Sequence, residues 1–243
     1  KRLTDGETDA RLQHLLQSLN EQTFSGELHM VDMESTSNLT DLAHTRCDLA
    51  VIALPLPYIQ DALDLAGRMK CRCALVLNSG IDSEKTREFQ EQARHYGIHL
   101  LGPNSLGMQI PRLKLNASHL GPLAKTGPIA LVSQSGALTS SILDWAQHNS
   151  VGFSSVVSLG PGSGVDIAQV LDFLANDPYT HSIVVYLEGI SNARRFMSAL
   201  RAAAHAKPVV VLKAGRKPAG NQAAQTHSGT IVGSDDVFDA ALR

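Results

Sequence analysis

The chain has 243 residues, of which 43% are hydrophobic, 18% charged and only 5% aromatic, and its net charge is −2. This composition is typical of a folded globular protein, and it excludes binding to nucleic acid or to a membrane surface through bulk charge. No apolar run approaches the roughly 20 residues that span a bilayer, so we expect neither a nucleic-acid partner nor a membrane.

The amino terminus and the cysteines indicate the cellular compartment of the protein. It begins on Lys1 with a polar stretch that is not a signal peptide, and without an initiator methionine. Its three cysteines, Cys47, Cys71 and Cys73, are too few for a disulfide framework and lack the CxxC spacing of a zinc site. We therefore expect part of a longer cytoplasmic protein that binds no metal itself.

The first half alternates short apolar runs with amphipathic stretches. The apolar runs predict strands at 27–33, 48–55, 73–80 and 98–107, and the amphipathic stretches predict helices at 58–70 and 83–97. Apolar runs separated by helices favour a parallel sheet with helices on its faces. We interpret residues 1–122 as one α/β domain that lacks its opening strand.

The second half repeats this alternation after an interruption. Residues 108–127 mix prolines, glycines and isolated apolar residues, and we interpret them as an irregular segment that crosses between domains. Strands are then predicted at 128–136, 153–160, 181–189 and 207–215, helices at 137–149, 166–177 and 192–206, and a long loop at 216–234. Residues 123–243 therefore form a second α/β domain.

The clearest candidate anion site is the turn SQSG, which links a strand to a helix. Ligands bind beyond the carboxyl ends of parallel strands, and the first turn of a helix offers backbone N–H groups to an anion. Ser133 or Ser135 could cap this helix, and Gly136 lets the backbone approach a phosphate closely. An ordinary capped turn without a ligand is the alternative.

A single carboxylate, Glu188, ends the very apolar strand SIVVYL. A half-buried carboxylate needs a partner, and an imidazole N–H is one that it could orient. The alternative is that Glu188 caps the following helix near Ser191. The chain has neither a GxxxxGK[ST] phosphate loop nor the GxSxG motif of a serine hydrolase.

Five motifs in order resemble the NDP-forming acyl-CoA synthetase family, which includes the succinyl-CoA synthetase α subunit and the ADP-forming acetyl-CoA synthetases. They are GPNSLG, GPIALVSQSGALT, YLEGI, KPVVVLKAGR and THSGTIVGSDDVFDAAL. The stretches ILDWAQ and SNARRFMSALRAA also resemble the synthetase-like part of bacterial protein lysine acetyltransferases, in which it is fused to a GNAT domain.

The family resemblance implies a fold and a set of site residues. The fold is a Rossmann-like CoA-binding domain followed by a flavodoxin-like domain of the succinyl-CoA ligase type. His227 aligns with the histidine that is transiently phosphorylated, and Glu188 with the carboxylate that holds it. The helix start that receives the phosphate aligns with Ser135, Gly136 and Ala137, and the turns that contact CoA align with Leu77, Asn78, Ser79 and Asn104.

The resemblance also implies an activity. The expected reaction interconverts acyl-CoA, phosphate and ADP with a carboxylic acid, CoA and ATP through the phosphohistidine. ATP, ADP and Mg²⁺ would be bound by an ATP-grasp domain or β subunit outside this chain, so we expect an oligomer, and a fragment that is inactive alone. The alternative function is an acyl-CoA-sensing regulatory module of a GNAT-type lysine acetyltransferase.

Overall fold

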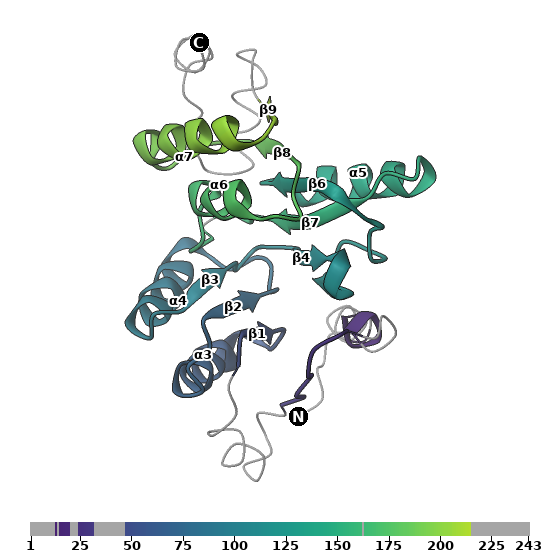
Figure 1. Ribbon diagram of the computed structural model, residues 1–243. Helices are drawn as coiled ribbons and strands as arrows, with labels where there is room; N and C mark the ends of the chain where they lie inside the picture. Colours follow the sequence, from purple (N-terminus) through teal and green to yellow (C-terminus); the bar gives the residue numbers. More distant parts are fainter. Residues whose placement is uncertain (1–12, 14, 20–23, 32–46, 162, 215–243) are drawn as a thin grey trace. The chain divides into compact units, whose positions relative to one another are not determined.

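The computed structural model describes residues 13, 15–19, 24–31, 47–161 and 163–214. These residues form two compact units, which are described separately (Figure 1). The first unit ends at Leu123 and also includes the short segment up to Val165, and the second contains the remaining residues from Ala124 onward. None of the described helices is long and apolar enough to cross a membrane.

The first unit contains a parallel sheet in the order β1-β2-β3, made of β1 (Leu49–Ile52), β2 (Cys73–Val76) and β3 (His99–Leu101). Helix α3 (Ile59–Arg68), which follows the short η1 (Leu56–Tyr58), and helix α4 (Ser83–His95) connect these strands. Both connections move the same way across the sheet, so right-handed crossovers place both helices on one face (Figure 1).

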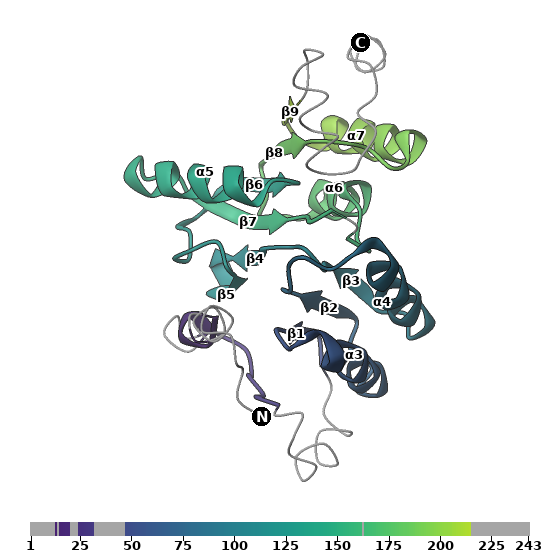
Figure 2. The same ribbon diagram turned by 180° about the vertical axis from the view of Figure 1, so that it is seen from behind.

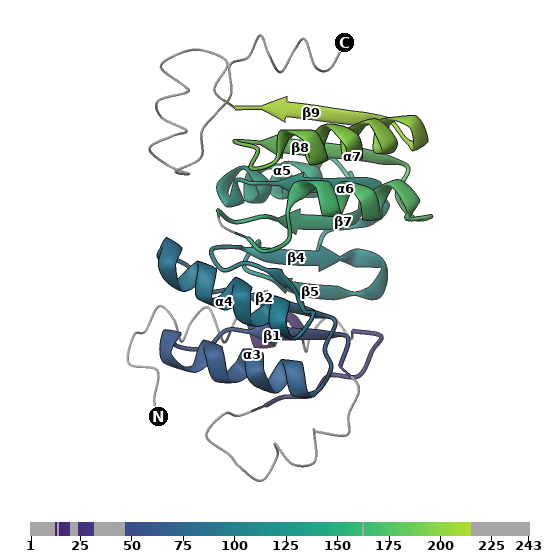
Figure 3. The same ribbon diagram turned by 90° about the vertical axis from the view of Figure 1, so that its left-hand side faces the viewer.

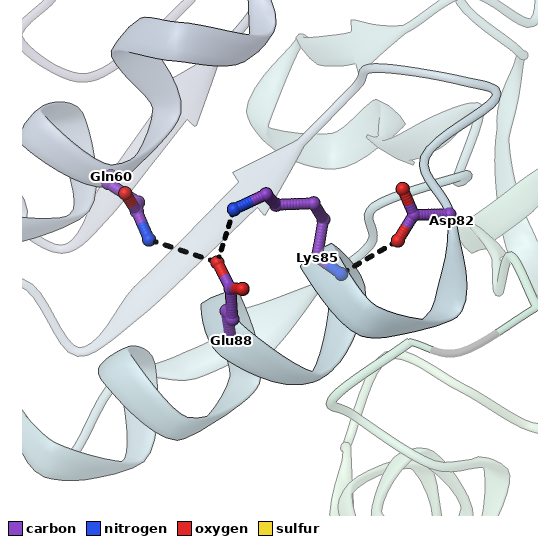
Figure 4. A network of polar contacts seen from close by, with 4 residues as sticks. All are labelled: Gln60, Asp82, Lys85 and Glu88. Carbon is purple, nitrogen blue, oxygen red and sulfur yellow. Dashed lines mark hydrogen bonds and ion pairs between the residues drawn. The ribbon is translucent and has the colours of Figure 1, made fainter.

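Apolar and polar contacts both fix α3 and α4. Leu63 of α3 and Phe89 of α4 are buried in one hydrophobic core with Val76 of the sheet. At the start of α4 the carboxylate of Asp82 accepts a hydrogen bond from the backbone N–H of Lys85 at 2.8 Å (Figure 4). The Lys85 ammonium pairs with Glu88 at 2.7 Å, and Gln60 of α3 donates to the same carboxylate.

Residues 108–127 do not form the predicted irregular crossing segment. They contain most of an antiparallel hairpin of β4 (Gly107–Ile110) and β5 (Leu115–Ser118), joined by η2 (Pro111–Leu113). The sequence pattern was misleading because the inward-facing residues are polar. Gln109, Asn116 and Ser118 are at most 1% exposed and satisfy one another by hydrogen bonds, such as Ser118 Oγ to Asn116 Oδ1 at 2.6 Å.

The strand predicted at 27–33 is wrong over its described residues. Residues 27–31 belong to no sheet, and the side chains of Leu28 and Met30 are 41% and 57% exposed. A strand is held by a hydrogen-bonded neighbour and a buried face. This segment pairs with no described strand, although Val31 at its end packs against the core. The alternation of apolar and polar residues in this segment was therefore not sufficient to predict a strand.

The described residues of the second unit form parallel strands in the order β7-β6-β8-β9. They are β6 (Thr126–Ser133), β7 (Phe153–Ser158), β8 (Ser182–Leu187) and β9 (Val209–Lys213). The connecting helices are α5 (Gly136–His148), α6 (Ile167–Asn176) and α7 (Ala193–Ala206). The predicted alternation of strands and helices is confirmed as far as residue 214, within a few residues at each boundary.

The order of these strands creates a switch point. The connection through α5 moves one way from β6, whereas those through α6 and α7 move the other way, so α5 lies on one face and α6 and α7 on the other (Figures 2 and 3). Connections therefore leave the carboxyl ends of β6 and β8 toward opposite faces. Such a point in a doubly wound sheet is where ligands bind.

Candidate functional site

The turn from β6 into α5 carries the predicted phosphate-binding residues. Ser135 is the N-cap of α5, because its Oγ accepts a hydrogen bond from the backbone N–H of Leu138 at 3.4 Å. Gly136 and Ala137 then lie in the first helical turn, where the helix supplies no acceptor for backbone N–H groups. These groups and the helix dipole together favour an anion at this position.

Ser133, the last residue of β6, shapes this turn and does not cap the helix. Its side chain is fully buried, its Oγ accepts from the backbone N–H of Ser135 at 3.1 Å, and it donates to the Ser135 carbonyl at 2.9 Å. The structure thus decides between the two serines that the sequence left open. Ser135 is the cap, and Ser133 fixes the backbone that presents it.

Gln134 joins this turn to the carboxyl end of β8. Its Oε1 accepts from the backbone N–H of Glu188 at 2.7 Å and from that of Gly189 at 3.0 Å, while its Nε2 donates to the Gly189 carbonyl at 3.0 Å. Its own backbone N–H donates to the Tyr186 carbonyl at 3.2 Å. One side chain therefore holds the backbone of the predicted catalytic carboxylate beside the start of α5.

The sequence reading missed Gln134. Glutamine neither titrates nor ranks among the preferred helix caps, so its residue type alone does not mark it as part of a site, although it lies inside the SQSG motif. The signal that could have identified Gln134 is its position: it follows the end of one strand, next to the ends of two other strands. Only the pairing of β6 with β8 shows that its carboxamide reaches the LEG turn.

Glu188 is half-buried directly after β8. Its negative charge adds to the effect of burial in raising the pKa of Tyr186, burial being the larger cause. The alternative in which Glu188 caps the next helix is not needed, because Asn192 caps α7 and accepts from the Arg195 backbone N–H at 3.0 Å. The backbone of Glu188 thus lies at the switch point, next to the residue that precedes the N-cap of α5.

The second predicted catalytic residue, His227, lies outside the described residues, as does the predicted loop at 216–234. Its approach to Glu188 therefore stays a prediction. Where the structure describes the chain, no group of three His, Cys, Asp or Glu side chains could hold a metal ion.

Two turns of the first unit, which carry the predicted CoA-binding residues, are tied to each other. The Asn104 side chain accepts from the Ile81 backbone N–H at 3.1 Å and donates to the Ile81 carbonyl at 3.0 Å. The Asn104 backbone N–H donates to the Asn78 carbonyl at 2.7 Å. Asn104 also has a φ of 62°, in the left-handed region that asparagine tolerates better than most residues. Its side chain therefore positions the turn after β2.

The other three predicted residues form that turn. Leu77 is buried, so it contributes its backbone and its packing, whereas Ser79 is exposed. The Nδ2 of Asn78 donates to the Leu54 carbonyl at 2.7 Å, but its Oδ1 is buried without a hydrogen-bond partner among the described residues. A buried acceptor without a donor is costly, and here it lies at a strand end where ligands bind.

Comparison with known proteins shows which proteins this chain is similar to. Residues 126–243 match the family described as the succinyl-CoA ligase like flavodoxin domain. The structure superposes on the Ca. Korarchaeum cryptofilum dinucleotide forming acetyl-coenzyme A synthetase 1 in complex with phosphate and ADP. This match has a TM-score of 0.86 and 29% identity, and it covers all of this chain and 54% of that one.

Two curated relatives show the same similarity at the level of sequence. The chain is 40% identical over 202 residues to acetate–CoA ligase [ADP-forming] I of Archaeoglobus fulgidus, covering 81% of this chain and 30% of that protein. It is 37% identical over 203 residues to the α subunit of acetate–CoA ligase [ADP-forming] I of Pyrococcus furiosus, covering 81% of this chain and 44% of that subunit. The chain thus spans less than half the length of these two relatives.

The predicted fold class is confirmed: a Rossmann-like part precedes a flavodoxin-like domain of the succinyl-CoA ligase type. The resemblance to this family is confirmed as well, because ADP-forming acetate–CoA ligases are relatives at 37–40% identity over 81% of this chain, and the structural match is to an acetyl-coenzyme A synthetase.

Proposed function

We propose that this chain is the CoA-binding and ligase portion of an ADP-forming acyl-CoA synthetase. The complete protein interconverts acyl-CoA, phosphate and ADP with a carboxylic acid, CoA and ATP. The phosphoryl group passes through His227, residues 1–122 bind CoA, and residues 123–243 carry the phosphoryl chemistry.

One observation carries the proposal most directly. The Gln134 side chain holds the backbone of Glu188 and Gly189 at 2.7–3.0 Å, immediately before the capped helix start at Ser135. The helix start that would bind the anion and the residue whose carboxylate would orient an imidazole are therefore connected through Gln134. A phosphoryl transfer to histidine needs both, because the donors neutralise the phosphate and the carboxylate fixes the tautomer of the nucleophile.

The reaction proceeds in three steps. An oxygen of inorganic phosphate attacks the thioester carbon, the carbon–sulfur bond breaks, and the CoA thiolate leaves and takes a proton. The product is an acyl phosphate. A ring nitrogen of His227 then attacks its phosphorus, the bond between phosphorus and the acyl oxygen breaks, and the carboxylate leaves, while Glu188 accepts a hydrogen bond from the other ring N–H. Finally a terminal oxygen of ADP attacks phosphorus, the phosphorus–nitrogen bond breaks, and ATP forms.

The start of α5 serves the first two steps. Backbone N–H groups of Gly136 and Ala137 bind the phosphate oxygens, and the positive end of the helix dipole stabilises charge on the transferring group. Ser135 keeps these groups in place as the cap of the helix.

The first unit supplies the CoA site. The buried Oδ1 of Asn78, which has no partner among the described residues, fits an N–H or O–H donor of a ligand such as CoA. Leu77 and Ser79 form the same turn, and Asn104 holds it in position through Ile81.

The nucleotide and Mg²⁺ are bound by a partner, either an ATP-grasp domain or a β subunit. The relative from Pyrococcus furiosus is named as an α subunit, which supports assembly with a second subunit. All three cysteines are free thiols, as expected in the reducing cytoplasm where we place the protein.

Phosphohistidine formation tests the proposal. The full-length protein is incubated with acetyl-CoA and labelled phosphate, and we expect a phosphoryl label that acid removes and base does not. His227→Ala should abolish the label, whereas His205→Ala at the exposed end of α7 should retain it. Equal labelling of wild type and His227→Ala would reject the proposed role of His227.

The regulatory module of a GNAT-type acetyltransferase stays the alternative prediction. Under that alternative the full-length protein binds acetyl-CoA but carries no acid-labile label. A GNAT domain beyond Arg243 would support it, and an ATP-grasp domain with no GNAT domain would support the synthetase.

A further inference from the structure

The three cysteines, which the proposed reaction does not use, gather at the amino ends of β1 and β2. Leu49 pairs with Cys73 in the parallel register, and the Cys73 backbone N–H donates to the Asp48 carbonyl at 3.3 Å. Continued by two residues, this register sets Cys47 opposite Cys71. Neighbouring strands lie about 4.8 Å apart, which is within the range of Cα separations that a disulfide bridges, about 4.4–6.8 Å.

The two thiols contact each other but differ in exposure. Cys71 is 3% exposed within the hydrophobic core of the first unit, and Cys47 is half-buried against the same core. A hydrogen bond joins their side chains. A reagent from solution therefore reaches Cys47 before it reaches the more deeply buried Cys71.

Their acidities differ as well. The hydrogen bond from Cys71 lowers the pKa of Cys47 to about 7, against the opposing effects of burial and of the Asp48 carboxylate. The same bond, burial and the nearby charges of Cys47, Asp48 and Cys73 raise the pKa of Cys71. Burial raises the pKa of Cys73 despite Arg72 beside it. Among the three cysteines, Cys47 is thus the one that ionises most readily to a thiolate.

We propose that Cys47 and Cys71 form a thiol-oxidation site that closes to an intramolecular disulfide with hydrogen peroxide as the oxidant. The Cys47 thiolate attacks one peroxide oxygen, the O–O bond breaks, and the departing hydroxide takes a proton, which leaves Cys47 as a sulfenic acid. The Cys71 sulfur then attacks the Cys47 sulfur. The S–S bond forms, and hydroxide leaves as water with the Cys71 proton. Two thiols are oxidised, and one peroxide is reduced to two waters.

The site is separate from the proposed CoA turn. Cys71 precedes β2 and Asn78 follows it, so the extended strand sets them at opposite ends, about 23 Å apart at 3.3 Å per residue. Oxidation therefore acts by cross-linking the start of β1 to the turn before β2, and not by contact with CoA. This inference does not depend on the proposed reaction.

Peptide mapping tests the disulfide. The full-length protein is treated with hydrogen peroxide, and unreacted thiols are blocked before digestion and mass spectrometry. We expect one intramolecular Cys47–Cys71 bond and an unmodified Cys73. Cys73→Ser is the matched control and should behave as wild type, whereas Cys71→Ser should leave a Cys47 sulfenic acid that dimedone traps. A wild-type protein that forms no such bond, or bridges Cys73 or two chains instead, overturns the proposal.

Alkylation kinetics test the reactivity without an oxidant. At pH 7 an ordinary thiol with a pKa near 9 is about 1% ionised, whereas Cys47 is about half ionised, a gain of about 50-fold in thiolate. Lower nucleophilicity offsets about eightfold of this gain, so we expect Cys47 to react with iodoacetamide about sixfold faster than an ordinary thiol. Cys71→Ala removes the hydrogen-bond donor and should slow this reaction at pH 7. An unchanged rate in a variant whose thermal melt shows that it is folded overturns the proposal.

Discussion

At the scale of single residues, the candidate site depends on a neutral side chain. Gln134 accepts two backbone hydrogen bonds and donates a third, and its partners are the backbone groups of Glu188 and Gly189. Backbone N–H groups near the interior are costly when unpaired. Gln134 therefore contributes both to stability and to the placement of the carboxylate.

Replacing Gln134 should affect both properties. Gln134→Leu leaves the N–H groups of Glu188 and Gly189 without their acceptor, and we expect a loss of about 1–3 kcal/mol in the free energy of unfolding. Labelling of His227 from acetyl-CoA and phosphate should fall by about 10- to 100-fold. Urea denaturation and labelling measure the two effects.

The matched control is Gln60→Leu, at an exposed glutamine of α3. We expect a change within about 0.5 kcal/mol and unchanged labelling. If Gln134→Leu behaves like this control, Gln134 does not position Glu188.

Glu188 itself can be tested by pH as well as by rate. Glu188→Gln keeps the shape of the side chain and removes its charge, and labelling should fall by about 10- to 100-fold. The charge of Glu188 adds to burial in raising the pKa of Tyr186, so this variant should also lower the Tyr186 pKa toward its ordinary value. Ultraviolet titration of tyrosine ionisation detects that change.

The raised pKa of Tyr186 also makes the stability of the fold depend on pH, because protonation is linked to folding. A tyrosine whose pKa is higher in the folded chain holds its proton longer than in the unfolded chain. The free energy of unfolding therefore falls as the pH rises above about 10, the unfolded value. We expect a smaller fall in Glu188→Gln than in wild type, and an identical fall would exclude the influence of Glu188 on Tyr186.

At the scale of elements, helix capping and anion binding at the start of α5 can be tested separately. Aspartate and asparagine cap helices about as well as serine, so Ser135→Asp and Ser135→Asn should both fold as wild type does. The aspartate places a negative charge where phosphate binds, so Ser135→Asp should abolish labelling from acetyl-CoA and phosphate. Ser135→Asn is neutral and should retain it.

Thermal melts and labelling of the two variants measure these effects side by side. Equal labelling of Ser135→Asp and Ser135→Asn would remove this helix start from the phosphate site.

The elements also show where sequence patterns succeed. Strands such as β8 and helices such as α5 were predictable because their apolar periodicity reflects burial against a core. The hairpin of β4 and β5 was not, because its inward-facing positions hold Gln109 and Asn116. Both side chains bond to Ser118 and donate to backbone carbonyls of the segment that follows β5, which no local pattern reveals.

At the scale of the whole molecule, the proposed reaction needs a nucleotide-binding partner. Residues 1–243 alone, given acetyl-CoA, phosphate and ADP, should form less than about 1% of the ATP that the full-length protein forms, because the step from phosphohistidine to ADP has no bound acceptor. A luciferase assay measures the ATP. A rate comparable to that of the full-length protein would show that this chain binds ADP itself.

The sequence by itself determined the α/β class and the resemblance to the acyl-CoA synthetases, and it named the candidate residues, because periodic burial and motif order are local properties of the chain. The tertiary structure decided which residues meet. Pairing of β6 with β8 brings Gln134 to Glu188, and the turns after β2 and β3 meet through Asn104 and Ile81. The neighbours of a strand end are set by the order of strands in a sheet, and that order depends on contacts between residues far apart in the chain.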